Sequence, residues 1–100
     1  MFSVPSVVKK AVSRGGAMRV EDIDEAVSVR ADFRGGEITP RAFRRGPRTY
    51  AVTEVNARWV DREGAQPVWR FSVQAGGDTY FLALRAGEMV WRLEKVMVEG

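Results

Sequence analysis

The chain has 100 residues, a hydrophobic fraction of 45% and a formal net charge of +3, and it contains neither cysteine nor histidine. Its length allows one hydrophobic core, and the missing residue types exclude disulfides, thiolate nucleophiles, the usual zinc ligand sets and an imidazole base. We therefore expect a small domain that folds without metal or disulfide support and has no catalytic residue, no enzymatic activity and no cofactor.

The first patterned segment, residues 3–14, carries apolar residues at the spacing that lines one face of a helix. This stripe consists of Val4, Val7, Val8, Ala11 and Val12. Ser3 is a suitable N-cap, and the Gly15-Gly16 pair is a natural end for the helix. We expect the stripe to pack over one end or face of a sheet, or against a protein partner or second copy of the chain.

From Val27 the hydrophobic period changes to two, which is typical of a half-buried strand. The segment from Glu37 to Arg45 contains Pro40, so we expect it at the edge of a sheet. Residues 48–60 predict one long strand whose apolar phase reverses near Thr53 and Glu54. A β-bulge at that point explains the reversal.

The second half of the chain continues the strand pattern between glycine turns. Trp69, Phe71 and Val73 share one phase, as expected of a strand with one buried face. Residues 80–84 are apolar on both phases, which favours a central strand covered on both sides. A last strand follows the turn at 86–87, and its phase shifts near Val96, which predicts a second bulge.

Five or six strands at this spacing predict a mainly β protein with one short N-terminal helix. We expect a small antiparallel meander that is bent or half-closed into a barrel. Residues 1–26 are then the helix and a linker, and residues 27–100 are the barrel-like domain.

Several short stretches of the β region resemble a family of small uncharacterised bacterial proteins. They are Pro40-Arg41-Ala42-Phe43, the segment Gly46-Pro47-Arg48-Thr49-Tyr50-Ala51-Val52-Thr53-Glu54-Val55, then Trp59, Val68-Trp69-Arg70-Phe71, Tyr80-Phe81-Leu82 and Val90-Trp91-Arg92-Leu93. Pro47 between the glycine and the arginine departs from the family pattern and puts the shape of that turn in doubt. The family has no known reaction, but similar domains occur as a C-terminal extension of some proteins related to translesion DNA polymerases. The resemblance therefore implies a role in DNA maintenance.

The excess of positive charge lies in one short segment. Arg41, Arg44, Arg45 and Arg48 occur within eight residues that contain no acid, beside the aromatic residues Phe43 and Tyr50. Clustered guanidinium groups neutralise phosphates, and neighbouring rings stack on unpaired bases, so this segment is a candidate nucleic-acid contact. The alternative is an edge strand whose charges prevent aggregation, with Phe43 and Tyr50 in the core.

Two other groups have a functional and a structural interpretation. Trp59, Trp69 and Trp91 suit either a stacking platform or the core, and the phase of Trp69 and Trp91 favours the core. The acidic run Glu21, Asp22, Asp24 and Glu25 lacks the spacing of a calcium loop, which favours a solvated turn or a helix start over a metal site.

The sequence shows no signal peptide and no run of about 18 apolar residues, so we expect a cytoplasmic protein that does not enter a membrane. The function that it favours is a noncatalytic nucleic-acid-binding or DNA-maintenance accessory module. The alternative is a protein-interaction or assembly module that docks through the N-terminal helix or an open sheet edge.

Overall fold

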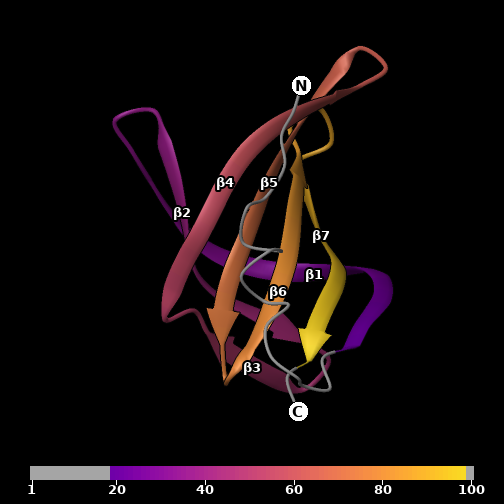
Figure 1. The fold of residues 1–100 in the computed structure, drawn as a ribbon. Helices are drawn as coiled ribbons and strands as arrows, with labels where there is room; N and C mark the ends of the chain where they lie inside the picture. Colours follow the sequence, from indigo (N-terminus) through magenta and orange to yellow (C-terminus); the bar gives the residue numbers. More distant parts are fainter. Residues whose placement is uncertain (1–18, 99–100) are drawn as a thin grey trace.

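The computed structural model describes residues 19–98, and all seven elements found there are β-strands. They are β1 (Arg19–Arg34), β2 (Glu37–Arg45), β3 (Arg48–Ala51), β4 (Glu54–Glu63), β5 (Gln66–Ala75), β6 (Asp78–Arg85) and β7 (Val90–Val98). The strands form one antiparallel sheet in the order β3-β2-β1-β7-β6-β5-β4. This sheet curls into a half-barrel (Figure 1), so the predicted mainly β, half-closed architecture is confirmed.

Strand β1 is the element that bends the sheet. Its first half pairs with β7, from Arg19 opposite Val98 to Val27 opposite Trp91, and its second half pairs with β2. The register with β7 shifts between Asp22 and Glu25, and Asp24, one of the two residues between them, has a φ of 52°. Such a bulge bends a strand and increases its twist. The change of partner therefore directs the end of β1, with β2 and β3, across the other strands (Figure 1).

Two layers result, and the hydrophobic core lies between them. The β1–β3 layer contains the second half of β1 with β2 and β3, and the β4–β7 layer contains β4 to β7 with the first half of β1. Phe43 is 1% exposed and packs from β2 against residues of β5, β6 and β7. The inward phase of these strands is formed by Phe71, Val73, Tyr80, Leu82, Leu93 and Val96. Trp69 and Trp91 pack against the same core, in agreement with the phase of their strands.

The long strand predicted over residues 48–60 is interrupted at the predicted point. Val52 and Thr53 separate β3 from β4, and they bond to different neighbours. The amide of Val52 donates to the carbonyl of Arg41 on β2, whereas the amide of Thr53 donates to the carbonyl of Gln74 on β5, each at 2.9 Å. The chain thus passes from one layer to the other here, and counting the two parts separately gives seven strands.

Strand β6 is covered on both faces, as its sequence predicts. Its side chains from Thr79 to Leu84 are all buried, whereas those of β1 alternate between exposed and half-buried over most of the strand. Two boundaries differ from the sequence prediction. The first strand begins at Arg19, so residues 19–26 belong to the sheet and not to a linker. The predicted helix at residues 3–14 lies outside the described residues.

Candidate nucleic-acid interface

The structure divides the predicted arginine cluster between different surroundings. Arg41 lies with its Nε 2.8 Å from Oδ2 of Asp32, and Arg45 lies with its Nε 3.0 Å from Oε2 of Glu25. Both partners are on the neighbouring strand β1. Because each guanidinium already faces a carboxylate, a phosphate would have to compete with a negative charge that is in place. The main role of these two arginines is therefore to link β2 to β1 through ion pairs.

The aromatic neighbours of the cluster are parts of the core. Phe43 stacks on Tyr50 with ring centres 5.0 Å apart and planes 8° from parallel, and its edge meets Tyr80 at 5.0 Å. The guanidinium carbon of Arg48 lies 5.9 Å from the centre of the Tyr50 ring. Phe43 therefore has no ring face available for a nucleobase, and Tyr50 is packed between a ring and a cation.

Arg44 is different, because it points to the outer side of the β1–β3 layer. The register pairs Arg44 with Ser28 on β1 and with Thr49 on β3, and it pairs Arg30 with Ala42. Arg30 and Arg44 are therefore diagonal neighbours on adjacent strands, with their stems within reach of one ligand. The sequence assigned Arg44 to the site but not Arg30, Ser28 or Thr49.

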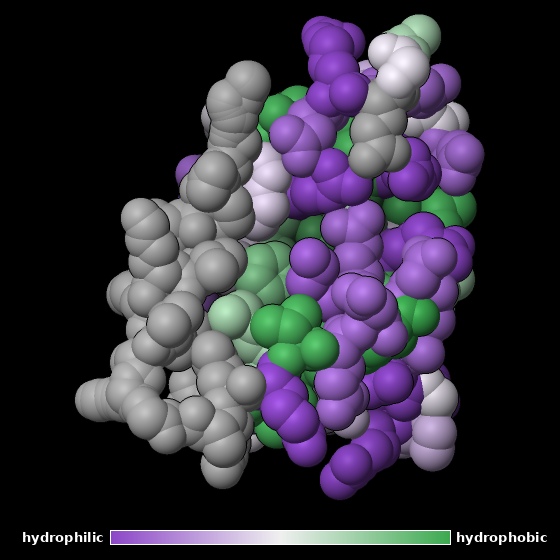
Figure 2. Space-filling model, turned by 45° about the vertical axis from the view of Figure 1, so that its right-hand side comes forward, coloured by the Kyte–Doolittle hydropathy of each residue, from purple (hydrophilic) through white to green (hydrophobic). Residues whose placement is uncertain are grey.

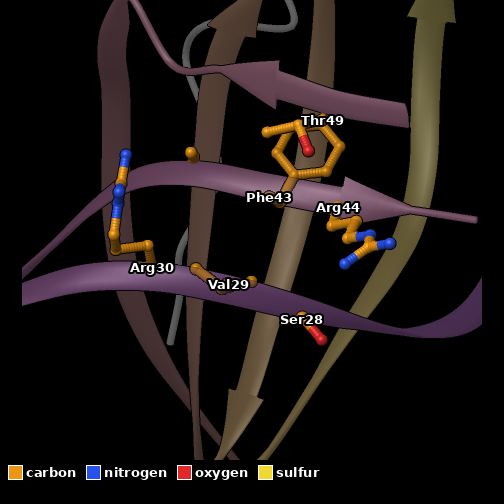
Figure 3. Close-up of a pocket in the computed structure, with 7 residues that line it drawn as sticks. Ser28, Val29, Arg30, Phe43, Arg44 and Thr49 are labelled. Carbon is orange, nitrogen blue, oxygen red and sulfur yellow. The ribbon is translucent and has the colours of Figure 1, made fainter. Parts of the chain in front are cut away.

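These four residues surround a shallow hollow of about 290 Å³. Figure 3 shows Arg30 and Arg44 at opposite sides of it, with Val29 between them on β1 and Thr49 on β3. Ala42 and the buried Phe43 complete its lining. A second hollow of about 370 Å³ lies on the other side of Arg44, toward Gly46. We call Ser28, Arg30, Arg44 and Thr49 the basic face.

The basic face has donors and few competing acceptors. Arg44 donates through Nε to the carbonyl of Gly46 at 3.2 Å, and its terminal nitrogens have no hydrogen-bond partner among residues 19–98. Within residues 19–98, no carboxylate lies within 4 Å of the Arg30 or Arg44 guanidinium. The exposed hydroxyls of Ser28 and Thr49 can also donate hydrogen bonds. Chemically, this arrangement suits an anion with several oxygens, such as a phosphate diester.

The turn that positions Arg44 and Arg48 is a two-residue hairpin loop. Gly46 has a φ of 59°, and the register pairs Arg45 with Arg48 across the turn. Glycine at the first position of such a loop is typical of a type II′ turn, and proline at the second position fits its fixed φ. Pro47 therefore makes a tight turn and does not disrupt the hairpin.

The acidic run at the start of β1 is distributed over several ion pairs. Glu25 pairs with Arg45, and Asp24 accepts a bond from Nε of Arg92 at 2.9 Å. Glu21 lies 3.6 Å from Arg19. Among residues 19–98, no three carboxylates come close enough together to hold a metal ion. These acids lie on the bulged strand β1, so neither the predicted turn nor the predicted helix start is found here.

Trp59 is the tryptophan that lies outside the core. Its Nε1 donates to Oδ2 of Asp61 at 3.2 Å, on the outer side of the β4–β7 layer. Arg70 donates to the same carboxylate at 2.6 Å and to both oxygens of Glu94 at 3.0 and 3.1 Å. This network lies on the opposite side of the molecule from the basic face, so Trp59 cannot add a stacking surface to it.

An apolar groove opens at the end of the half-barrel, between the β1–β2 hairpin and the β6–β7 turn. It has a volume of about 390 Å³ and includes Phe33, Ile38, Trp69, Leu84 and Met89 in its lining. Phe33 is 64% exposed and Met89 72% exposed. In Figure 1 the β1–β2 hairpin stands away from the neighbouring strands at this end of the molecule.

No family model, curated protein or solved structure matches this chain. The resemblance to the small bacterial family therefore remains a prediction. In the described part of the chain, no helix has the length and apolar character needed to cross a membrane.

Proposed function

We propose that this protein is a noncatalytic module that binds the phosphate backbone of nucleic acid through its basic face. The observation that carries the proposal is the pair of guanidinium groups, Arg30 and Arg44, beside two exposed hydroxyls and away from the carboxylates of the described residues. The resemblance of residues 27–100 to a family with members fused to polymerase-like proteins favours DNA as the nucleic acid. Arg48 is not counted in this contact, because it lies opposite Arg45 and over the Tyr50 ring, on the other phase of β3 from Thr49.

The proposed site contacts the phosphate backbone and not the bases. The rings of Phe43 and Tyr50 are packed in the core, so no aromatic side chain on this face can stack on an unpaired base. Phosphate contacts fix the position of a protein on nucleic acid but carry no direct sequence information. We therefore expect little dependence on sequence and no preference for single strands based on stacking.

The number of arginines sets the expected salt dependence. Two phosphate contacts predict a slope of about −1.8 for the logarithm of the binding constant against the logarithm of salt concentration on duplex DNA. This value indicates weak binding that is strongest at low ionic strength.

The test is a fluorescence-anisotropy titration of a labelled 20-base-pair duplex at several salt concentrations. The double substitution Arg30→Glu/Arg44→Glu is expected to abolish the binding seen with the native chain at low salt. The matched control is Arg34→Glu/Arg62→Glu, which changes the net charge equally but alters arginines at two hairpin ends. Loss of binding in both variants to the same degree would show that net charge alone attracts the DNA and would reject the basic face.

A second function, self-assembly, is favoured by the apolar groove at the open end. Exposed apolar side chains gathered around a hollow usually mark an interaction surface. Phe33 and the groove lie at the same end of the same chain, so a twofold contact could bury the Phe33 ring of each copy against the groove of the other. We propose a second copy of this chain as the occupant.

Sedimentation velocity over a hundredfold range of concentration tests the second function. The native chain is expected to form dimers as concentration rises, and Phe33→Ser/Met89→Ser is expected to remain monomeric. Val20→Ser is the matched control, because Val20 is also an exposed apolar residue, at 55%, but lies away from the groove. A native chain that stays monomeric throughout would contradict the assembly proposal.

A further inference from the structure

The outer side of the β4–β7 layer is apolar and buried, although it faces away from the core. Residues of the outward phase on three neighbouring strands are at most 8% exposed, namely Val68, Ser72, Thr79, Phe81, Ala83 and Met97. The register places Ser72 opposite Phe81 and Thr79 opposite Met97, so these side chains form one continuous surface. A sheet face of this composition is stable only when another element covers it.

The described strands do not supply that cover. All seven lie in a single curled sheet, and the β1–β3 layer packs on its inner side. Arg70 lies between Val68 and Ser72 on β5, opposite Ala83, and reaches over β6 to Glu94 on β7. It also donates to Asp61, beside Trp59, so this network crosses one part of the apolar surface. A hollow of about 490 Å³ also reaches this surface and is lined by Val20, Phe81 and Met97 among others. Figure 2, which brings the β7 side forward, shows hydrophobic groups between hydrophilic ones.

We propose that residues 3–14 dock on this surface as an amphipathic helix, with the stripe Val4, Val7, Val8, Ala11 and Val12 against Phe81, Ala83 and Met97. The proposal is independent of nucleic-acid binding, which uses the opposite side of the molecule. It assigns the site to a segment of this chain, which distinguishes it from docking by a second copy or another protein.

The length and direction of the chain fit this occupant. Strand β1 starts at Arg19 beside the end of β7, and Val20 lies on the outer phase next to Met97. Residues 15–18 can span at most about 14 Å, which is enough to leave the sheet edge and turn back over it. A 12-residue helix is about 18 Å long. This length is enough to cross three strands that lie about 4.8 Å apart.

A buried hydroxyl on the same surface points to a polar contact from the covering segment. Ser72 is fully buried, and its Oγ has no hydrogen-bond partner among the described residues. An unpaired buried hydroxyl destabilises the folded state, so native proteins normally satisfy such a group. Ser3, at the N-cap position of the proposed helix and outside the pair changed in the control below, offers a hydroxyl for this contact.

The absence of cysteine from the native sequence allows a direct test in the full chain. Ala83→Cys places a single thiol on the proposed docking surface, and Thr49→Cys places one on the exposed basic face as a reference. Reaction with a maleimide is expected to be at least about tenfold slower at position 83 than at position 49. Adding Val7→Asp/Val8→Asp is expected to remove this protection at position 83 and leave the rate at position 49 unchanged.

The matched control is Ser6→Asp/Ser13→Asp, which adds the same charge to the segment outside the apolar stripe and should preserve the protection. Protection that survives Val7→Asp/Val8→Asp would overturn the proposal. Oxidation of the double variant Val8→Cys/Ala83→Cys identifies the occupant. A monomer with an internal disulfide supports docking within the chain, whereas a disulfide-linked dimer shows that a second copy supplies the segment and also overturns it.

Discussion

The side chain of Tyr80 connects the two layers of the sheet. Its ring contacts Phe43 at 5.0 Å and Tyr50 at 5.4 Å between centres, so one side chain of β6 meets both β2 and β3. Desolvation by burial raises the pKa of the Tyr80 phenol above its ordinary value of 10.0, and the negative charges of Tyr50 and Asp78 raise it further. Arg45 and Arg48 act in the opposite direction but do not cancel these effects.

This shift predicts a loss of stability in alkaline solution. The folded state holds the Tyr80 proton more tightly than the unfolded chain does. The contribution of this phenol to the free energy of unfolding is therefore fully present below about pH 10 and is lost as pH rises through the higher folded pKa. Urea unfolding between about pH 8 and about pH 11 measures it. Tyr80→Phe should flatten the decline, whereas Tyr50→Phe should keep most of it. Equal declines in the native chain and Tyr80→Phe would contradict the assignment.

The arginine cluster shows which features of the site a local sequence pattern does not predict. The spacing of Arg41, Arg44, Arg45 and Arg48 indicated a basic segment, but only the pairing with β1 decides which guanidinium meets Asp32 or Glu25. Arg30 was visible as a polar residue on an alternating strand. Its neighbour Arg44 is 14 positions away, and nothing local to either residue predicts that they share a face.

At the scale of elements, local patterns predicted the strands well. The period of two, the glycine turns and the phase reversal near Thr53 each depend on residues that are close together in the chain. They can therefore be recognised in the sequence. The order of strands is different, because β1 pairs with β7 across most of the chain length. The bulge at Asp24 was also hidden, since aspartate tolerates a positive φ without the glycine that would have marked it.

The β6–β7 turn contains a second residue with a positive φ, and it gives a prediction. Met89 has a φ of 55° and is 72% exposed, so it bears a backbone cost of about 1–2 kcal/mol with little packing in return. Met89→Gly relieves this cost but loses entropy on folding, for an expected net gain of about 0.5–1 kcal/mol in the free energy of unfolding. Urea denaturation measures the difference.

The neighbouring Glu88 provides the control, because no positive φ is found there. Glu88→Gly is expected to destabilise the chain by about 0.5–1 kcal/mol. If both glycine variants change stability in the same direction, strain at Met89 is not the reason.

At the scale of the whole molecule, β7 occupies the middle of the sheet. Three strands lie on each side of it, and it contributes Leu93 and Val96 to the core. A chain ending at Glu88 is therefore expected to show no cooperative urea transition by tryptophan fluorescence, because β1 and β6 both lose their partner. A chain ending at Val98 should unfold in one transition. Cooperative unfolding of the shorter chain would show that the two sides are stable separately.

The position of β7 also sets the order of events when the chain is made. Until residues 90–98 leave the ribosome, the β1–β2–β3 and β4–β5–β6 groups each end in a strand with unpaired backbone groups. Such edges pair readily with strands of other molecules. Two nascent chains that meet at this stage can each insert β7 into the other, so we expect rapid synthesis at high concentration to increase the share of exchanged dimers and aggregates.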